Sequence, residues 1–549
     1  MSSPHVFRSL GSWRTVLTAA VALMFFLTAC GRTERMVDTG VREGVLHLGN
    51  GAEPPDLDPH VVTGVPEFHI IDALFEGLVS INPETRQPAP GVAERWEVSA
   101  DGTVYTFHFW PGLKWSDGTA LTAADFVRTY ERIMNPALGS EYTYLFEILE
   151  GGPAYITGES TDFSTVGVIA HDARTLEIRL RHPVPYFLSL LTYTCWRPLP
   201  IHVIERFDGL RRRGTEWTRE GNLVGNGSFR LKTWSQNRVI VVERNPYYWD
   251  AATVSLNAIH FHPVESVDTE ERMFRSGQLH KTNDIPSAKM PTYAEMADSP
   301  LRVDPQLGTY YYRMNVTRPP LDDARVRLAM SLAIDREAIV THVTRRGETA
   351  AGSFSPPGMG GFVPAKTVAF DPDKARALLA EAGYPNGVGF PGAELLYNTS
   401  ENHRAVAEAI QQMWRRELGI DVQLFNQEWK VYLDSMTNLD YGLARSGWVA
   451  VYDDANQFVE IMTTGNPNNR TGWGDPAYDR LHAASMAEQN PAKRAAMIQQ
   501  LDAMLIEGGP IAPVYHYTRA YLLDPRVKGW WPNPLDKHPY KHVRLVDAP

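Results

Sequence analysis

The sequence predicts an α/β protein built from two or three lobes. Its 549 residues exceed what a single hydrophobic core normally supports. Between residues 394 and 451, apolar segments of strand length alternate with helical segments. This order is typical of a mostly parallel sheet covered by helices, and it places an α/β lobe at residues 304–518. The earlier half is richer in hairpins, which indicates an α+β arrangement.

Local patterns define the elements of the first half. Residues 45–48 predict a strand that ends at Gly49, and residues 96–110 predict a hairpin with Asp101-Gly102 at its turn. Thr122 is expected to cap a helix, with Asp125 at the capping-box position. The buried face of that helix would carry Phe126, Tyr130 and Ile133. Further strands are expected at residues 228–234, 238–244 and 256–262.

The second half contains clear helix signals. An apolar stripe of Val326, Met330 and Ala333 predicts one helix, and Asp335 starts another that Gly347 would close. Asp371-Pro372 and Gly383 supply the N-cap, first-turn proline and C-terminal glycine of a third. The alternation then predicts strands at 394–397, 420–425 and 442–451, with helices at 403–418 and near 431.

Composition excludes some classes of partner. Apolar residues make up 43% of the chain and charged residues 21%, as in ordinary globular proteins. The formal net charge of −11 argues against a nucleic-acid partner, which would favour a basic surface.

The N-terminus is predicted to be an export signal. Arg8 and Arg14 precede an apolar run at residues 16–29 that is too short for a comfortable transmembrane helix. The run ends in Leu27-Thr28-Ala29-Cys30, which resembles the bacterial lipobox; the alternative is a plain signal peptide with a chance cysteine. Residues 1–29 would be removed, and residues 30–45 would form the lipidated Cys30 and a polar tether. The mature chain would keep only Cys195, so no intramolecular disulfide is expected.

Catalytic and metal motifs are missing from the sequence. It has no His-Glu-x-x-His, Gly-x-Ser-x-Gly or phosphate-loop pattern. His260 and His262 share a strand face and could ligate a metal, but no Cys or acidic partner stands at ligand spacing, so a structural role is expected and no metal or cofactor is predicted. Asp453 and Asp454 are adjacent strand residues whose side chains would point to opposite faces, which weakens an acid–base pair.

An ordered set of motifs resembles one family. The chain is similar to the family 5, peptide-type extracytoplasmic solute-binding proteins of ABC importers, especially the oligopeptide binders. The matching segments run collinearly from about residue 45 to the end and include Gly91-Val92-Ala93-Glu94-Arg95-Trp96, Leu113-Lys114-Trp115-Ser116-Asp117-Gly118-Thr119, Arg244-Asn245-Pro246-Tyr247-Tyr248-Trp249, Pro320-Leu321-Asp322-Asp323-Ala324-Arg325 and Pro467-Asn468-Asn469-Arg470-Thr471-Gly472-Trp473.

The resemblance implies a three-lobed clamp of the periplasmic-binding-protein type (class II, cluster C). Lobe I would comprise residues 46–79, 202–303 and 519–549, lobe II residues 80–201, and lobe III residues 304–518. Crossovers near 303 and 518 would form a hinge that closes lobe III onto lobe I. An extended peptide between the lobes would be held by backbone hydrogen bonds, which bind any sequence.

The resemblance also implies ligand-binding residues. Backbone groups would come from Val65, Gly447 and Val449, and Trp429 and Trp448 would line side-chain pockets. Tyr142, Tyr311, Tyr517 and Asn398 would lie near the cleft, and Arg445 and His403 would meet a ligand carboxylate. For four of these residues a structural role stays open: Trp429 and Tyr517 as core aromatics, His403 as an exposed helix-start residue, and Arg445 paired internally with Asp440 or Glu428.

One departure from the family bears on the ligand. Peptide binders carry an aspartate for the ligand's α-ammonium at the position that Val451 occupies here. A buried ammonium without a counter-charge costs several kcal/mol. Asp453, two residues on, is expected to substitute if the strand continues; otherwise the ligand lacks a free amine. Met436, Thr437 and His280 also depart from the family pattern.

The function implied is capture of oligopeptides by a monomeric lipoprotein in the periplasm or on the cell surface. It would deliver them to permease subunits served by cytoplasmic ATPases, and it would perform no chemistry. Alternatives are a non-standard cargo (a cell-wall peptide, a modified peptide or an opine-like molecule), a sensing or adhesive lipoprotein, and a secreted hydrolase that uses Asp453 or Asp454. Ligand length, the membrane that holds the anchor and the permease partner are not specified by the sequence.

Overall fold

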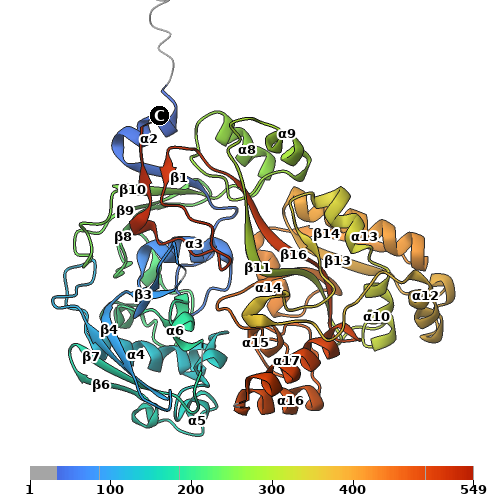
Figure 1. The fold of residues 1–549 in the computed structure, drawn as a ribbon, viewed down its shortest axis with the longest axis horizontal. Coiled ribbons are helices and arrows are strands. Elements are labelled where there is room, and N and C mark those ends of the chain that lie inside the picture. The colour runs from blue at the N-terminus through green and yellow to red at the C-terminus, as the bar shows by residue number, and fades with distance from the viewer. Residues whose placement is uncertain (1–33, 86, 185, 489, 548–549) are drawn as a thin grey trace, which may run out of the picture.

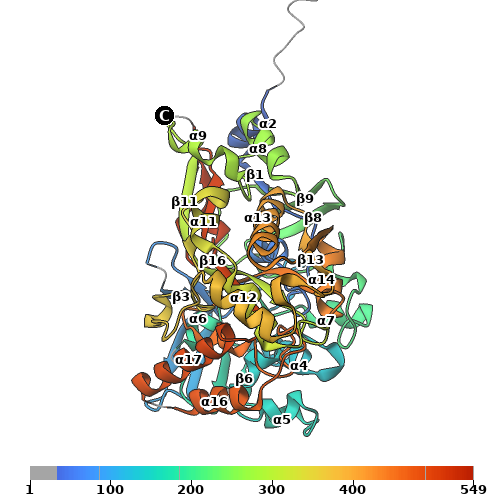
Figure 2. The same ribbon diagram turned by 90° about the vertical axis from the view of Figure 1, so that its right-hand side faces the viewer.

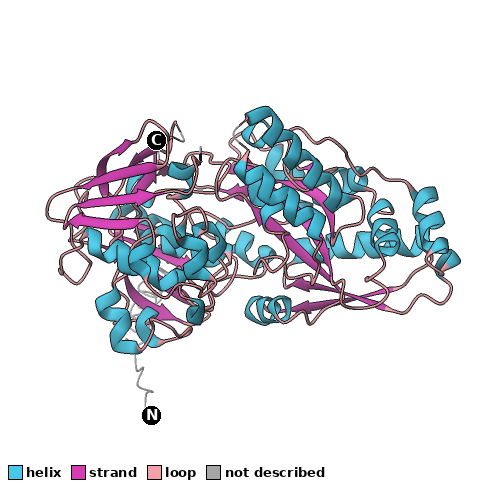
Figure 3. Ribbon diagram, turned by 90° about the horizontal axis from the view of Figure 1, so that it is seen from below, coloured by secondary structure: helices cyan, strands magenta, loops and turns pink. Residues whose placement is uncertain are grey.

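The fold is that of a computed structural model, which describes residues 34–547 except 86, 185 and 489. The predicted signal peptide and Cys30 lie outside the described residues. Among the helices that are described, none is both long and apolar enough to cross a membrane. The elements gather into two halves joined by a pair of long strands (Figure 1). Helices and strands are mixed in both halves (Figure 3).

The expected tether is partly helical. Helix α2 (Met36–Glu43) packs on strand β1 (Val45–Gly49) and buries Val37 and Gly40. The backbone N–H of Val37 donates to the carbonyl of Gly277, and Arg526 forms an ion pair with Asp38. The segment is polar overall, so its composition did not indicate that the face with Val37 and Gly40 would pack against the first sheet.

The first sheet has the strand order β1-β10-β9-β8. Strand β1 is parallel to β10 (Ala258–His262), whereas β9 (Val239–Arg244) and β8 (Phe229–Ser235) join it in antiparallel fashion. Leu46, Leu48, Ile259 and Phe261 point to one face and pack in the same core as residues of α3 (Val65–Leu74). By strand alternation, His47, His260 and His262 share the opposite face.

The second sheet is antiparallel, in the order β4-β5-β7-β6. The predicted hairpin is confirmed as β4 (Ala93–Val98) and β5 (Val104–Phe109). The capping box of Thr122 and Asp125 is also confirmed at the start of α4 (Ala123–Met134), which buries the predicted apolar face. The remaining elements of this region are β2 (Val79–Ile81), β3 (Pro88–Pro90), α5 (Gly152–Ile156), β6 (Val168–Asp172), β7 (Thr175–Arg179), α6 (Phe187–Leu190) and α7 (Ile201–Ile204).

The third sheet has six strands, in the order β12-β16-β11-β15-β13-β14. They are β12 (Thr349–Ala350), β16 (Ile511–Leu522), β11 (Leu301–Met314), β15 (Leu443–Val449), β13 (Ala393–Asn398) and β14 (Val422–Gln427). Strand β13 is parallel to both β14 and β15, as the alternation predicts. The other pairings are antiparallel, so the expectation of a mostly parallel sheet is wrong. The long strands β11 and β16, which the sequence patterns did not identify, make the sheet mixed.

Helices cover this sheet. In Figure 2 the helices α12 (Pro372–Glu381) and α13 (Glu401–Leu418) face the viewer in front of it. Trp414 of α13 lies in the same core as Tyr310 and Tyr312 of β11, and its indole N–H donates to the carbonyl of Met330. Asp371 caps α12 and Gly383 follows it with φ +98°, as predicted. The helix begun by Asp335 ends instead at Arg345, in a left-handed conformation.

The other helices of this half are α10 (Ala324–Leu332), α11 (Arg336–Ala338), α14 (Trp429–Thr437), α15 (Asn456–Glu460), α16 (Pro476–Ala487) and α17 (Pro491–Ile506). Helices α8 (Val267–Arg275) and α9 (Met290–Ala294) precede β11, and β17 (Val527–Lys528) and β18 (Arg544–Leu545) follow β16.

Strands β11 and β16 connect the two halves. They pair from Leu301 with Leu522 to Arg313 with Ile511, and their register shifts between Pro305 and Thr309. Both crossovers expected near 303 and 518 fall in this paired region. The connection between the halves is therefore a double strand with an irregularity in its middle.

Candidate functional site

Two adjoining cavities lie between the halves. Cavity A has a volume of about 210 Å³ and cavity B about 120 Å³, and both are bordered by Val65, Val449 and Asp536. Ten of the twelve predicted ligand-binding residues line one or both: Val65, Tyr142, Asn398, His403, Trp429, Arg445, Gly447, Trp448, Val449 and Tyr517. The structure thus brings together side chains that span nearly the whole sequence.

Strand β15 offers a free backbone edge to these cavities. On one side it pairs with β11, and the N–H of Ala450 donates to the carbonyl of Leu307. Backbone groups alternate between the two edges of a strand, so those of Val449 and Gly447 point away from β11. On that second side, β13 pairs only with Leu443 and Ala444. The carbonyl of Arg445 on this side accepts from the Tyr432 hydroxyl. The edge is therefore open to an extended chain from Gly447 onward.

Gly447 is required by a close approach. A Cβ atom built on it would lie 2.3 Å from the hydroxyl oxygen of Tyr517 and 3.2 Å from Cζ of the same ring. The Tyr517 ring therefore lies directly on the β15 backbone. This contact joins Tyr517, which borders cavity A, to Gly447, which borders cavity B.

Arg445 in cavity A is a guanidinium without a carboxylate partner among the described residues. Nη1 donates to Oδ1 of Asn398 at 3.2 Å and Nη2 to the hydroxyl of Tyr517 at 3.0 Å, while Nε is buried without a partner. Asp440 pairs with Arg318 instead, and Glu428 caps α14, so the internal pairings considered for Arg445 are not formed. A guanidinium stays charged in proteins, and this one is free to bind an anion.

His403 lies beside Arg445 at the start of α13. Its backbone N–H is capped by Ser400, and its ring lies 5.7 Å from that of Tyr310. Desolvation, and then the nearby charges of Arg445 and Arg346, hold the pKa of His403 well below its usual range. The imidazole is consequently neutral and provides one donor and one acceptor to cavity A.

Trp429 joins the two sides of the cleft. Its indole N–H donates to Oε1 of Glu67 on α3 at 3.1 Å, and a Cβ on Gly64 would lie 2.8 Å from its ring. Burial raises the pKa of Glu67 to about 7. In cavity B the buried indole N–H of Trp448 has no partner among the described residues. One tryptophan therefore closes the cleft, and the other keeps a free donor.

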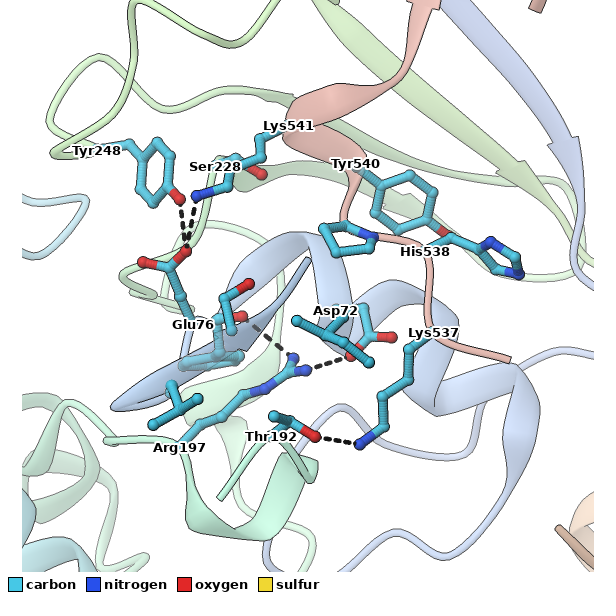
Figure 4. A pocket seen from close by; sticks show the side chains of 16 residues that line it. Asp72, Glu76, Thr192, Arg197, Ser228, Tyr248, Lys537, His538, Tyr540 and Lys541 are labelled. Atoms are coloured by element: carbon cyan, nitrogen blue, oxygen red, sulfur yellow. Dashed lines mark hydrogen bonds and ion pairs between the residues drawn. The ribbon is translucent and has the colours of Figure 1, made fainter. Parts of the chain in front are cut away.

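The far end of cavity B is formed by Val451 and Lys537. The Lys537 ammonium donates to Oγ1 of Thr192 at 2.5 Å and to the carbonyl of Val451 at 3.3 Å. The nearby Asp72 pairs with Arg197, as Figure 4 shows. Burial lowers the pKa of Lys537 to about 7. The described residues place no carboxylate in an ion pair with this ammonium.

A smaller cavity of about 60 Å³ adjoins cavity B through Asp72, Thr192 and Lys537 (Figure 4). Charged groups in its walls have partners within the protein: Glu76 accepts from Tyr248 and forms an ion pair with Lys541. Arg197 and Lys541 in this cavity have carboxylate partners, whereas Lys537 has none among the described residues.

The family assignment follows from comparison with known sequences. Residues 87–470 match the model of the bacterial extracellular solute-binding proteins, family 5, middle region. The chain belongs to this family. It is 36% identical over 545 residues to the periplasmic oligopeptide-binding protein OppA of Salmonella typhimurium, an alignment covering 96% of this chain and 98% of that protein.

Solved structures of similar proteins share the fold. Haemophilus influenzae OppA in complex with the peptide RPPGFSPFR gives a TM-score of 0.87 at 33% identity, covering 92% of this chain and 99% of that one. The Escherichia coli murein tripeptide-binding protein MppA gives 0.87 at 35% identity, with the same coverage. Its unliganded open form gives only 0.61, over 92% of this chain and 98% of that one. The arrangement of this family 5 protein is therefore more similar to that of the peptide-bound OppA structure than to that of the unliganded open form of MppA.

Two predicted site residues lie elsewhere. Tyr311 faces Phe354 in the core and not the cleft, and its hydroxyl accepts from Arg313. Strand β15 ends at Val449, so the chain bends before Asp453 and does not continue on the Val451 face. The exposed Asp453 carboxylate accepts from the N–H of Gly360. Asp453 is not the expected substitute anchor.

The structure also argues against the hydrolase alternative, which requires Asp453 or Asp454 to face the cleft. Asp454 forms an ion pair with Arg494, and neither Asp453 nor Asp454 borders cavity A or B.

Sequence patterns did not single out Lys537, Thr192 or Asp536. Lys537 lies 86 residues from Val451, and no local motif marks it. The one available signal was Val451, which stands where the family resemblance implies an aspartate. Its presence indicates that another residue determines the charge at that end of the cleft.

Proposed function

We propose that the protein is the substrate-binding lipoprotein of an ABC importer that captures oligopeptides in an extended conformation. The observation that carries this proposal is the free edge of β15 at Gly447 and Val449, which borders two cavities. Beside it lies Arg445, a guanidinium without a carboxylate partner among the described residues. An added strand would bond to Gly447 and Val449 whatever its sequence. Its carboxylate would meet Arg445 and its side chains would enter the cavities.

The lobes proposed are residues 46–79, 202–303 and 519–549 (lobe I), 80–201 (lobe II) and 304–518 (lobe III). The β11–β16 pair supports a hinge between lobes I and III, because it is the long double connection and its register is irregular. Contacts between lobes hold the closed form: Trp429 with Glu67, and Arg470 with Glu141. Ligand release would break these contacts.

Membrane attachment through Cys30 is part of the proposal. The lipobox-like residues 27–30 support it, and the periplasmic location of the OppA relative fits an exported protein. The anchor would keep the receptor beside the permease subunits that receive the peptide.

A direct test is to purify the protein without denaturation and analyse the denatured sample by mass spectrometry. We expect peptides to be released. After their removal, di- to hexapeptides are expected to raise the melting temperature, because a ligand that binds only the folded state stabilises it. A mixture of free amino acids is the control. Absence of both co-purified peptide and peptide-specific stabilisation would refute the proposal.

A second candidate cargo is a peptide whose amino terminus is blocked, or whose terminal group is neutral or acidic. The observation that favours it is the Lys537 ammonium beside the carbonyl of Val451, at the position where the family resemblance implies an acidic partner for the ligand's α-ammonium. A cell-wall peptide also fits the comparisons, because the similar protein MppA is named a murein tripeptide-binding protein. Matched peptides with free and acetylated amino termini separate the cases. Tighter binding of the acetylated set supports this cargo, and a tenfold preference for the free amine excludes it.

A further inference from the structure

Three histidines outside the peptide cleft meet on one face of the first sheet. His260 and His262 are alternate residues of β10, and His47 of β1 is the register partner of His260. One ring nitrogen from each lies within 4.8 Å of the others, and Nδ1 of His47 is 3.2 Å from Nε2 of His262. The sequence showed only the pair on β10; the parallel pairing of β1 supplies the third ring.

From this geometry we infer that His47, His260 and His262 form a binding site for a transition-metal ion of the zinc class. Two alternate residues on one strand and a third on its neighbour give three imidazoles that converge from one sheet face. Three histidines with an open fourth position are an established zinc ligand set. Imidazole ligands select Zn²⁺, Cu²⁺ or Ni²⁺ over Mg²⁺ and Ca²⁺, which prefer oxygen.

The spacing fits such an ion after small ring movements. Zinc–nitrogen bonds of about 2.0–2.1 Å in a tetrahedral site place ligand nitrogens roughly 3.4 Å apart. His47 and His262 already meet this distance. His260 is half-buried, whereas His47 and His262 are 6% and 8% exposed. The two buried rings are thus close together, and the third ring is the most accessible of the three.

The surroundings hold His47 in place. The backbone N–H of His47 donates to Nδ1 of His280 at 3.0 Å, and Nε2 of His280 lies 3.2 Å from the carbonyl of Val37. Both nitrogens of His280 are used, so it supports the set without joining it. A Cβ on Gly40 of α2 would lie 3.3 Å from the His47 ring. Helix α2 therefore covers the cluster on one side.

Charge around the cluster does not oppose a cation. The described residues place no acidic group in an ion pair with these three rings, and Lys232, the cation near His260, is paired with Glu243 at 3.1 Å. Burial lowers the pKa of His47 to about 3 and that of His262 to about 4. A metal ion binds the neutral form of imidazole.

The site is separate from the peptide cleft. The three histidines are not among the residues bordering cavities A and B. Strands β1 and β10 lie beside α2 at the upper left of Figure 1, away from β15. A bound ion would join β1 to β10 and stabilise the first sheet without contacting peptide.

The test uses the tag-free mature protein in equilibrium dialysis and calorimetry with Zn²⁺, and with Mg²⁺ as the comparison ion. We expect one Zn²⁺ per chain, a rise in melting temperature and no effect of Mg²⁺. His260→Gln and His262→Gln should each weaken zinc binding by more than the roughly 10–100-fold that loss of an outer-shell partner costs. The exposed His342 lies outside the cluster, and His342→Gln should leave zinc binding unchanged.

Metal-free melting curves of the variants establish that they fold, and His260→Gln is the gentlest change because its ring is half-exposed. Zinc binding that survives the His260→Gln/His262→Gln double variant would overturn the inference, as would the absence of stoichiometric zinc in the wild type. Peptide binding is expected to be equal in all variants, so this result is independent of the proposed peptide function.

Discussion

The Nζ atom of Lys537 lies 3.3 Å from the carbonyl oxygen of Val451, at the bottom of cavity B. Two uncharged oxygens, from Val451 and Thr192, solvate this ammonium. In the peptide binders that this chain resembles the arrangement is the opposite, with an aspartate at this position and an ammonium brought by the ligand. At this end of the cleft, the protein therefore carries a positive charge where the peptide binders carry a negative one.

Removing this cation should change which amino termini are accepted. At pH 6, below the pKa of about 7, Lys537 is charged. A ligand ammonium nearby would be repelled, because two unit charges about 4 Å apart interact by roughly 4 kcal/mol at an effective dielectric constant near 20. We expect Lys537→Met to bind free-amine peptides about tenfold or more tightly, with no gain for acetylated peptides. Calorimetry measures both, and the exposed Lys374→Met is the control; equal changes for the two peptide sets would contradict the assignment.

Arg445 should select a ligand carboxylate. Hydrogen bonds to charged groups contribute about 1.5–3 kcal/mol, so Arg445→Gln is expected to weaken binding of peptide acids by roughly 10–100-fold. C-terminally amidated peptides should lose little. Arg318→Gln, an exposed arginine paired with Asp440, is the matched control. If acids and amides weaken by the same factor, Arg445 supports the cleft and does not contact the carboxylate.

Local sequence was sufficient for elements whose determinants are neighbours in the chain. The Thr122–Asp125 capping box and the Asp371, Pro372 and Gly383 signals each act within one or two helical turns, and the structure confirms them. The resemblance placed ten residues around one cleft because an ordered series of motifs carries the whole fold.

Long-range pairing was beyond local patterns. Strands β11 and β16 are almost two hundred residues apart, and their antiparallel pairing makes the third sheet mixed. The same limit explains Asp453: the end of β15 at Val449 depends on how the following chain packs, so alternation could not be extended to residue 453. Lys537 and His47 reach their partners only through the assembled tertiary structure.

Gly447 should tolerate no side chain. A Cβ there would meet the Tyr517 hydroxyl at 2.3 Å, and moving that ring would break its bond to Arg445. Gly447→Ala is therefore expected to weaken peptide binding by about tenfold or more, through loss of a charge-assisted hydrogen bond and displacement of the strand edge. Gly442→Ala is the control, because its nearest neighbour would lie 3.5 Å away. Equal affinity in both variants would show that the ring moves without cost.

Glu67 should make stability fall as the pH rises. Burial raises its pKa from 4.5 to about 7, so the folded state binds a proton more tightly than the unfolded state does. The stabilisation is complete below about pH 4.5 and is lost progressively up to about pH 7, with a total of at most about 3 kcal/mol. Glu67→Gln keeps an acceptor for the Trp429 indole but cannot ionise. We expect the variant to match the wild type near pH 4.5 and to exceed it at pH 7 and above. Urea unfolding across this range measures the difference, with the exposed Glu94→Gln as control. A difference that does not vary with pH would show that Glu67 is not protonated in the closed protein.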